Sequence, residues 1–308
     1  MTLSPAPLLT NGATHSAQSF RMMIRDLAGG SEGVTQGGDL KVAPLAVPAG
    51  GVQIGDGSAI IQGRASPSQG HYTAYNIGSE TLRIAPAASL LRCDLVVLRV
   101  QDPQYEGSRD PAKDPVVFFD VIPNVSLTQT ELPPGYSGIP LARIMMPINT
   151  GTVTASMITD LRQVANPRRD RQIYTASPVG DQDWPGNEKG QWVAWPPVAR
   201  WNIKVPPWAV SMRAVMTIAG VQVMKGSVWG GSGFQLGAAQ GQSVWFETGS
   251  ASRIHMISAD TVEIPAAMRG TTQPLQAMVS LDQNNAGVLQ ADIATTAIAD
   301  IEFEEGTY

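Results

Sequence analysis

The stretch LLRCDLVVLRVQD, Leu90–Asp102, decides the fold class of this chain. In an extended conformation Leu95 and Val97 point to one face, and the apolar residues between and beyond them point to the other. A strand that is apolar on both faces is typical of a sheet covered on two sides. The pattern therefore predicts an interior strand within a layered β structure.

Charged residues stand at both ends of this predicted strand. Arg92 and Asp94 share a face and are close enough to pair, while Arg99 and Asp102 stand at the far end. These charges could form the rim of a catalytic site or the frame of a buried strand, and the stretch alone leaves both open. Cys93, the one cysteine of the chain, lies inside the apolar run, which predicts a buried thiol and no intrachain disulfide.

The composition favours a mainly β protein. Charged residues make up 15% of the 308 residues and hydrophobic residues 43%, and there are 31 glycines and 23 prolines. This mixture suits many short strands joined by tight turns better than long solvated helices. The net charge of -5 provides no basic field for phosphates, which argues against a nucleic-acid partner.

The N-terminal segment MTLSPAPLLTNGATHS, residues 1–16, lacks the basic start and the uninterrupted apolar core of a secretory signal. No later segment approaches the roughly 18 apolar residues that a membrane-spanning helix needs. We therefore expect neither export by that route nor insertion into a membrane.

One amphipathic helix is predicted near the start, in SAQSFRMMIRDLAGG, residues 16–30. Ser16 can cap its first turn, and Gly29–Gly30 can end it. The helical period predicts an apolar stripe that packs on a neighbouring sheet or subunit, formed by Phe20, Met23, Ile24 and Leu27.

The chain is expected to form two domains. Asn166-Pro167 breaks the local pattern, three arginines follow within four residues, and all seven tryptophans come later. We predict an N-terminal β-rich domain with one leading helix over residues 1–165. Short strands and turn signals over residues 166–308 predict a tryptophan-rich, jelly-roll-like β-sandwich.

No residue pattern predicts catalysis, a metal site or a cofactor. The three histidines are scattered, and the glycine cluster GGSGFQLG (230–237) lacks a nucleotide-binding spacing and is interpreted as a hairpin turn. DQNN (282–285) is interpreted as a solvated hairpin tip. A pair of carboxylates for glycoside hydrolysis remains an alternative, with the candidates Asp181, Asp183, Glu188, Asp260 and Glu263.

Four tryptophans in GQWVAWPPVARWNIKVPPWAV are the candidate receptor or interface residues: Trp192, Trp195, Trp201 and Trp208. Flat indole rings stack on sugars or fill interfaces. Packing in the core or between subunits is the favoured interpretation, because their spacing does not hold them on one strand face.

The first half of the chain resembles minor tail proteins of long-tailed phages, especially those that infect actinobacteria. The resemblance covers residues 18–165 and rests on seven motifs in the same order: RDL (25–27), GDLKV (38–42), VPAGGVQI (47–54), QG-Y (69–72), LRCDLVVLRVQDPQY (91–105), IPLARIMMP (139–147) and ITDLRQ (158–163). The C-terminal half, with IPAAMRGTTQPLQAMVSL and DIEFEE, is similar to the closing sandwich of the same group, though less specifically.

The resemblance implies a virion protein of the tail tip or baseplate, made in the host cytoplasm, that contributes to host adsorption. Its expected partners are itself, as a homotrimer or higher homo-oligomer, other tail proteins, and a host cell-surface glycan. It implies no enzyme activity, and it makes the charges of the motifs scaffold residues: Arg92, Asp94, Arg99, Asp160 and Arg162. The alternatives are a tail-associated carbohydrate-binding module and a glycan hydrolase.

Overall fold

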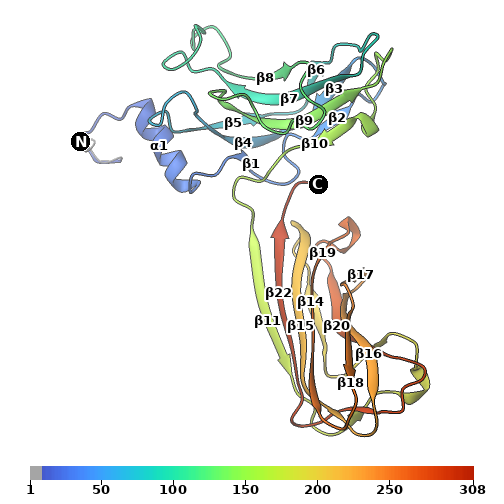
Figure 1. Cartoon of the computed structure of the whole chain (residues 1–308). Helices are drawn as coiled ribbons and strands as arrows, with labels where there is room; N and C mark the ends of the chain where they lie inside the picture. Colours follow the sequence, from blue (N-terminus) through green and yellow to red (C-terminus); the bar gives the residue numbers. More distant parts are fainter. Residues whose placement is uncertain (1–8) are drawn as a thin grey trace. The chain divides into compact units, whose positions relative to one another are not determined.

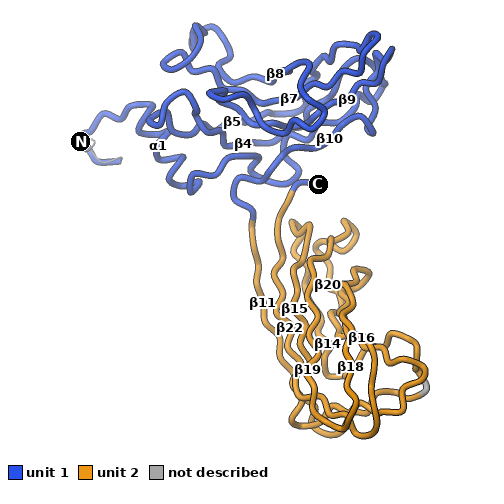
Figure 2. The backbone as a smooth tube through the Cα atoms, viewed as in Figure 1, with its two compact units in different colours: residues 1–167, 307–308 blue, residues 168–306 orange. Residues whose placement is uncertain are grey.

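The computed structural model describes residues 9–308. The first half of the N-terminal segment 1–16, which we expect to lack the function of a secretory signal, therefore lies outside the described residues. The chain divides into two compact units (Figure 2): the first runs to Pro167 and includes Thr307–Tyr308, and the second is Arg168–Gly306. The predicted boundary, between residues 165 and 166, differs by two residues, and the return of the last two residues to the first unit was not expected.

The first unit consists of three antiparallel sheets and α1 (Ala17–Leu27), which is the one α-helix among the described residues (Figure 1). A four-stranded sheet has the order β10-β9-β7-β8, and two three-stranded sheets have the orders β1-β4-β5 and β2-β3-β6. The strands are β1 (Gly33–Val34), β2 (Val42–Pro44), β3 (Gly51–Ile54), β4 (Gly57–Gln62), β5 (His71–Asn76), β6 (Glu80–Arg83), β7 (Arg92–Val100), β8 (Val117–Ile122), β9 (Gly138–Met146) and β10 (Ile158–Asp160).

The strand predicted from the opening stretch is β7, and it lies in the interior as expected. It pairs with β8 on one side and β9 on the other, and six consecutive residues from Cys93 to Leu98 are buried. Val96, Leu98 and Val100 on one face of β7 form a core with residues of β3, β4 and β9. Leu95 and Val97 on the other face are also buried, as expected for a strand that is apolar on both faces. Burial raises the pKa of the Cys93 thiol.

Helix α1 has the predicted ends but not the predicted buried stripe. The Ser16 side chain accepts a hydrogen bond from the backbone N–H of Ser19, and the chain leaves the helix through Gly29 and Gly30 with positive φ. Phe20 and Leu27 are exposed. The helix lies against β5 through the buried Arg21, whose partners lie far away in the sequence.

The second unit is a sandwich of two antiparallel sheets around one apolar core. Its eight principal strands are, from first to eighth, β11 (Arg169–Ala176), β14 (Arg200–Lys204), β15 (Ala209–Val223), β16 (Val228–Leu236), β18 (Val244–Thr248), β19 (Arg253–Glu263), β20 (Thr272–Leu281) and β22 (Thr296–Glu305). Short strands extend the sheets: β12 (Gln182–Asp183), β13 (Val193–Ala194), β17 (Ala239–Gln240) and β21 (Leu289–Ala291).

The pairing of these strands is that of a jelly roll. In one sheet the first strand pairs with the eighth, the eighth with the third, and the third with the sixth, which is the order β11-β22-β15-β19. In the other sheet the order is β14-β20-β16-β18, that is second, seventh, fourth and fifth. The structure therefore confirms the predicted mainly β class and the jelly-roll-like sandwich.

The strand β11 begins at Arg169, directly after the boundary between the units, and the Arg171 guanidinium binds Asp300 on β22 at 2.5 Å. One local sequence interpretation is wrong in this unit. The glycine cluster at 230–237 is not a hairpin turn but lies almost wholly in the strand β16. Glycine is tolerated inside this strand because other groups approach its backbone closely.

An ion pair fastens one end of the β15–β19 pair. Arg253 donates to both carboxylate oxygens of Asp292, at 3.0 and 2.5 Å, and to the backbone carbonyl of Gly220 at 2.6 Å. Gly220 has a φ of +73° and lies at the irregularity between Ile218 and Val221, where a side chain would meet the carbonyl of Ala294. These contacts stabilise the irregularity in the pairing of β15 with β19, and the hydrogen bonds from Arg253 lower the pKa of Asp292 to about 2.

This lowered pKa predicts acid sensitivity of the second unit. Because the folded pKa lies below the ordinary value of about 3.9, the stabilisation from Asp292 is present above about pH 4 and is lost as the pH falls through about 2. Asp292→Asn should therefore melt at a lower temperature than the wild type near neutral pH, and the difference should shrink at about pH 2. Thermal melts at both pH values measure this, and a difference that stays constant would contradict it.

Candidate functional site

The charges at the start of β7 serve the fold. Asp94 is 0% exposed, and its carboxylate accepts two hydrogen bonds from Arg92 Nε, at 3.0 and 2.8 Å. It also accepts one from the backbone N–H of Asn124 at 2.9 Å, in the turn after β8, where Asn124 has a positive φ. Both carboxylate oxygens are occupied, so Asp94 joins the turn to β7 and is not free to act as a base.

A second group of motif charges joins β10 to the loop before β2. The Arg162 guanidinium is buried and donates to both carboxylate oxygens of Asp160, at 3.0 Å through Nε and 2.7 Å through Nη2. It also donates to the backbone carbonyls of Asp39, at 2.5 Å, and of Tyr308, at 3.3 Å. Arg162 therefore also holds the C-terminal residue within the first unit.

A third group docks α1. Arg21 Nε donates to the carbonyl of Gln69 at 2.8 Å, and its guanidinium lies over the rings of Tyr72 and Tyr105. The Tyr72 hydroxyl donates to Asp102 at 2.8 Å, and burial raises the pKa of this phenol above its usual range. The protonated phenol and the buried arginine thus satisfy Asp102, which is again a structural role.

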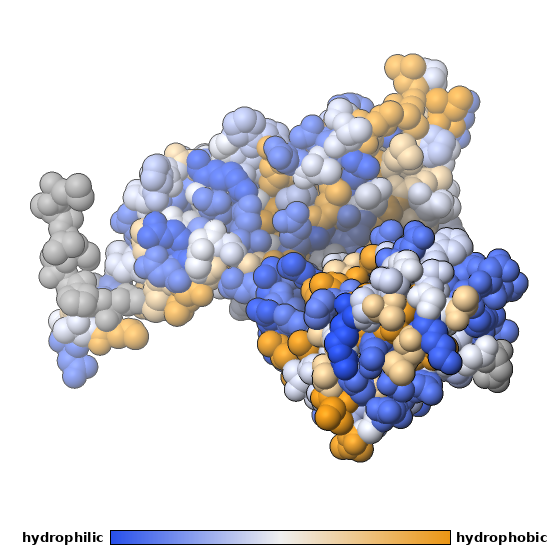
Figure 3. Space-filling view, turned by 60° about the horizontal axis from the view of Figure 1, so that its bottom comes forward, coloured by the Kyte–Doolittle hydropathy of each residue, from blue (hydrophilic) through white to orange (hydrophobic). Residues whose placement is uncertain are grey.

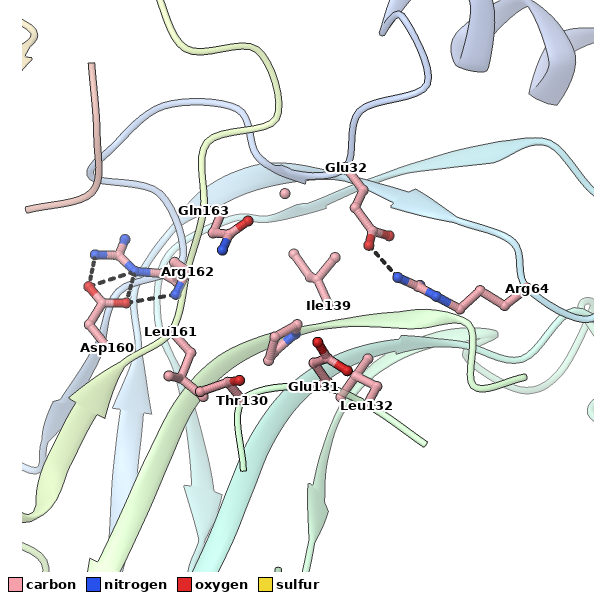
Figure 4. A pocket seen from close by; sticks show the side chains of 12 residues that line it. Glu32, Arg64, Thr130, Glu131, Leu132, Ile139, Asp160, Leu161, Arg162 and Gln163 are labelled. Atoms are coloured by element: carbon pink, nitrogen blue, oxygen red, sulfur yellow. Dashed lines mark hydrogen bonds and ion pairs between the residues drawn. The ribbon is translucent and has the colours of Figure 1, made fainter. Parts of the chain in front are cut away.

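A cleft of about 670 Å³ opens in the first unit and is lined by charged residues (Figure 4). Its acids are mostly neutralised, since Glu32 forms an ion pair with Arg64 and Asp160 forms one with Arg162. Glu131 is exposed at the cleft. The cleft can admit a small polar molecule, but its paired acids are poorly suited to act as a nucleophile or base.

The carboxylates considered for glycoside hydrolysis are not gathered into one site. Asp260 and Glu263 lie three residues apart on β19, so their side chains point to opposite faces. Asp183 on β12 lies level with the far end of β15, and the strand register places it roughly 27 Å from Asp260. Asp181 precedes β12, and Glu188 ends a short 3-10 helix.

The histidines bind backbone groups. His15 accepts from the N–H of Leu9, His255 accepts from the N–H of Gly220, and a ring nitrogen of His71 lies 3.2 Å from the carbonyl of Gly30. Among residues 9–308 no group of three or more histidine, cysteine, aspartate or glutamate side chains is arranged to hold a metal ion.

The four tryptophans predicted as receptor or interface residues occupy different environments. Trp195 is 1% exposed and belongs to the core of the jelly roll, so it cannot contact a receptor. Trp201 and Trp208 are partly buried against the same core, where Trp201 meets the ring of Tyr174 and Arg168 lies over Trp208. Trp192 alone among the four lies on the outer face of the sheet that contains β16.

Trp192 is joined there by Trp229 on β16 and Trp245 on β18, and we call these three residues the tryptophan cluster. The rings of Trp229 and Trp245 are stacked with centroids 5.8 Å apart, and Trp192 meets Trp245 edge-on at 6.5 Å. Trp229 and Trp245 are 47% and 62% exposed. The sequence did not predict that Trp229 and Trp245 belong to a site. They become neighbours only because β16 pairs with β18 in the register that places Gly231 opposite Trp245.

An exposed apolar surface also occurs at one end of the first unit. Backbone hydrogen bonds from Ala87 to Thr150, from Asn149 to Ala88 and from Val153 to Ala49 hold three loops side by side. The large apolar side chains exposed on these loops, which we call the apolar end, are Val47, Leu90, Leu91 and Ile148. A gathering of hydrophobic residues is visible at the upper right of Figure 3, over the first unit.

Comparisons with known proteins give no family. No protein family model matches the chain. No curated protein matches it either. Among solved structures, a T13 particle of infectious bursal disease virus aligns over 94% of this chain and 84% of its own, with a TM-score of 0.25 and 12% identity.

Two further alignments are of the same low similarity. The VP2 subviral particle of infectious bursal disease virus has a TM-score of 0.25 and 11% identity over 89% of this chain and 78% of its own. BuGH86wt in complex with neoagarooctaose has a TM-score of 0.22 and 9% identity over 82% of this chain and 32% of its own. Similarities of this size carry no statement about function.

Within residues 9–308 no helix is long and apolar enough to cross a membrane, since α1 is both too short and too polar.

Proposed function

We propose that this protein is a structural component of a phage tail, part of the tail tip or baseplate, and that it contributes to host adsorption. The first unit assembles with further copies of the chain, with a trimer as the expected state, and with other tail proteins. The second unit faces the host surface. The protein has no catalytic role in this proposal.

The apolar end of the first unit is the observation that carries the proposal. Its four large side chains stand on loops that are fixed to one another by backbone hydrogen bonds, so the surface is already formed in the single chain. Exposed apolar patches of this kind mark sites of protein association. Preorganised loops lose little conformational entropy when a partner covers them.

The internal contacts of the tail-protein motifs support a structural role as well. Asp94, Asp102 and Asp160 are each bound by an arginine, and none of them is left to bind or activate a substrate. The charged residues of the motifs that resemble phage tail proteins thus stabilise the fold of the first unit, as expected for a protein that acts by assembly.

Assembly can be tested by light scattering on the purified full-length chain. We expect an oligomer, and we expect the double variant Leu90→Ser, Ile148→Ser to dissociate it without loss of folding. Ile257→Ser is the matched control, because Ile257 on β19 is about as exposed as Ile148 but lies in the second unit. A monomeric wild type, or an oligomer that resists the double variant, would contradict the proposal.

A further inference from the structure

We propose that the tryptophan cluster on the outer face of the β16–β18 pair is a binding site for an uncharged, pyranose-containing glycan chain. This inference deepens the proposed function, on which its biological setting rests, by naming the residues and the ligand class of adsorption.

The sheet is built to hold one indole ring close against it. A side chain at Gly231 would place its Cβ 2.6 Å from the ring of Trp192, and a side chain at Gly233 would come within 3.9 Å of the same ring. Trp192 therefore packs directly on β16, in space that other residues would fill. Gly231, which was interpreted as part of a turn in the sequence, provides this space, whereas a Cβ at Gly233 would only reach ordinary contact with the ring.

The other two rings stand beside it. Trp229 and Trp245 stack on each other, and Trp245 meets Trp192 at an interplanar angle of 60°. The three rings thus form a corner with two differently inclined aromatic surfaces. A pyranose ring presents apolar C–H groups on its faces and hydroxyls around its rim, so one such ring can contact both surfaces at once.

Turn residues fix the position of Trp229. The Asn285 side chain accepts a hydrogen bond from the backbone N–H of Trp229 at 2.7 Å and donates to its carbonyl. The N–H of Asp282 donates to that carbonyl as well, at 3.0 Å. Asn285 is buried, so the DQNN segment is not merely a solvated tip but holds the strand that carries the ring.

Polar groups at the cluster match an uncharged, hydroxyl-rich ligand. Glu247 is the cross-strand partner of Trp229, and its exposed carboxylate forms no hydrogen bond or ion pair within the described residues. An indole N–H is a hydrogen-bond donor, so the tryptophans of the cluster can donate to ligand hydroxyls. An acidic residue beside the rings disfavours an anionic polymer, which selects a neutral glycan.

The test uses the purified full-length chain on an array of neutral and anionic glycans. We expect binding to at least one neutral glycan, and Trp229→Ala and Trp245→Ala should each weaken it by about tenfold or more, which is about 1.4 kcal/mol. Gly231→Val, which displaces the ring of Trp192, should weaken it as well. Tyr75→Ala is the control, since Tyr75 is an exposed aromatic residue of the first unit.

Melting temperatures and light scattering on the same variants separate the outcomes. Lost glycan binding with unchanged folding and oligomeric state supports the site. No binding to any neutral glycan, binding that survives Trp229→Ala and Trp245→Ala, or binding only to anionic glycans overturns it. Dissociation of the oligomer by these variants also overturns it, because the cluster is then a protein interface. A monomeric chain that still binds glycan through the cluster would contradict the assembly proposal and leave the site standing.

Discussion

Trp195→Ala is expected to destabilise the second unit by about 3 to 5 kcal/mol, because it removes a fully buried aromatic ring and leaves a cavity in the jelly-roll core. Trp195→Phe should cost less, since it keeps a ring and removes an indole N–H that has no hydrogen-bond partner. Denaturant unfolding followed by tryptophan fluorescence measures both, because all seven tryptophans lie in the second unit.

Trp245→Ala is the matched control for this prediction. It removes the same side chain from the surface, where the loss of ring contacts should cost about 1 kcal/mol or less. If Trp195→Ala unfolds at the same denaturant concentration as Trp245→Ala, the core position of Trp195 is wrong. The comparison also separates packing tryptophans from binding tryptophans.

Asp94→Ala should lower the stability of the first unit by about 2 to 3 kcal/mol. The substitution removes the carboxylate that pairs with the partly buried Arg92, and it leaves the backbone N–H of Asn124 without a hydrogen-bond acceptor. Asp94→Asn should cost less, because its amide oxygen can still accept from Asn124. Near-ultraviolet circular dichroism includes the signal of this unit, because five of the six tyrosines belong to it, and comparison with tryptophan fluorescence identifies the part that comes from the second unit.

The tryptophan fluorescence transition provides the internal control for Asp94. It reports on the second unit alone, so it should stay in place while the dichroism transition of the first unit moves to lower denaturant. An unchanged dichroism transition would show that the carboxylate contributes nothing to the fold, despite its burial. A loss of glycan binding in this variant, with both units folded, would contradict its purely structural role.

Local patterns in the sequence predict β7 and the ends of α1 correctly. A strand with apolar residues on both faces and a serine that caps a helix are each defined by a few consecutive residues, so both can be recognised without knowing the fold. The buried face of α1 could not be predicted in this way. It is determined by Arg21, whose partners Gln69 and Tyr105 become neighbours only when the sheets assemble.

The same limit applies to the tryptophan cluster. Alternation along β18 places Trp245 and Glu247 on one face, but it does not say which strand lies beside them. The cross-strand register that brings Trp229 next to them comes from the jelly roll as a whole. The four tryptophans predicted as receptor or interface residues were chosen because they are close in sequence. This choice correctly included Trp192, but it also included Trp195, which belongs to the core.

A cryo-EM map of the purified tail of the phage that encodes this chain would test the proposal that the protein is an assembled tail component. We expect several copies around the tail axis, with the apolar end of the first unit covered by a neighbouring protein and the tryptophan cluster facing solvent. A tail without density for the chain would contradict the proposal, and so would copies whose apolar end is uncovered.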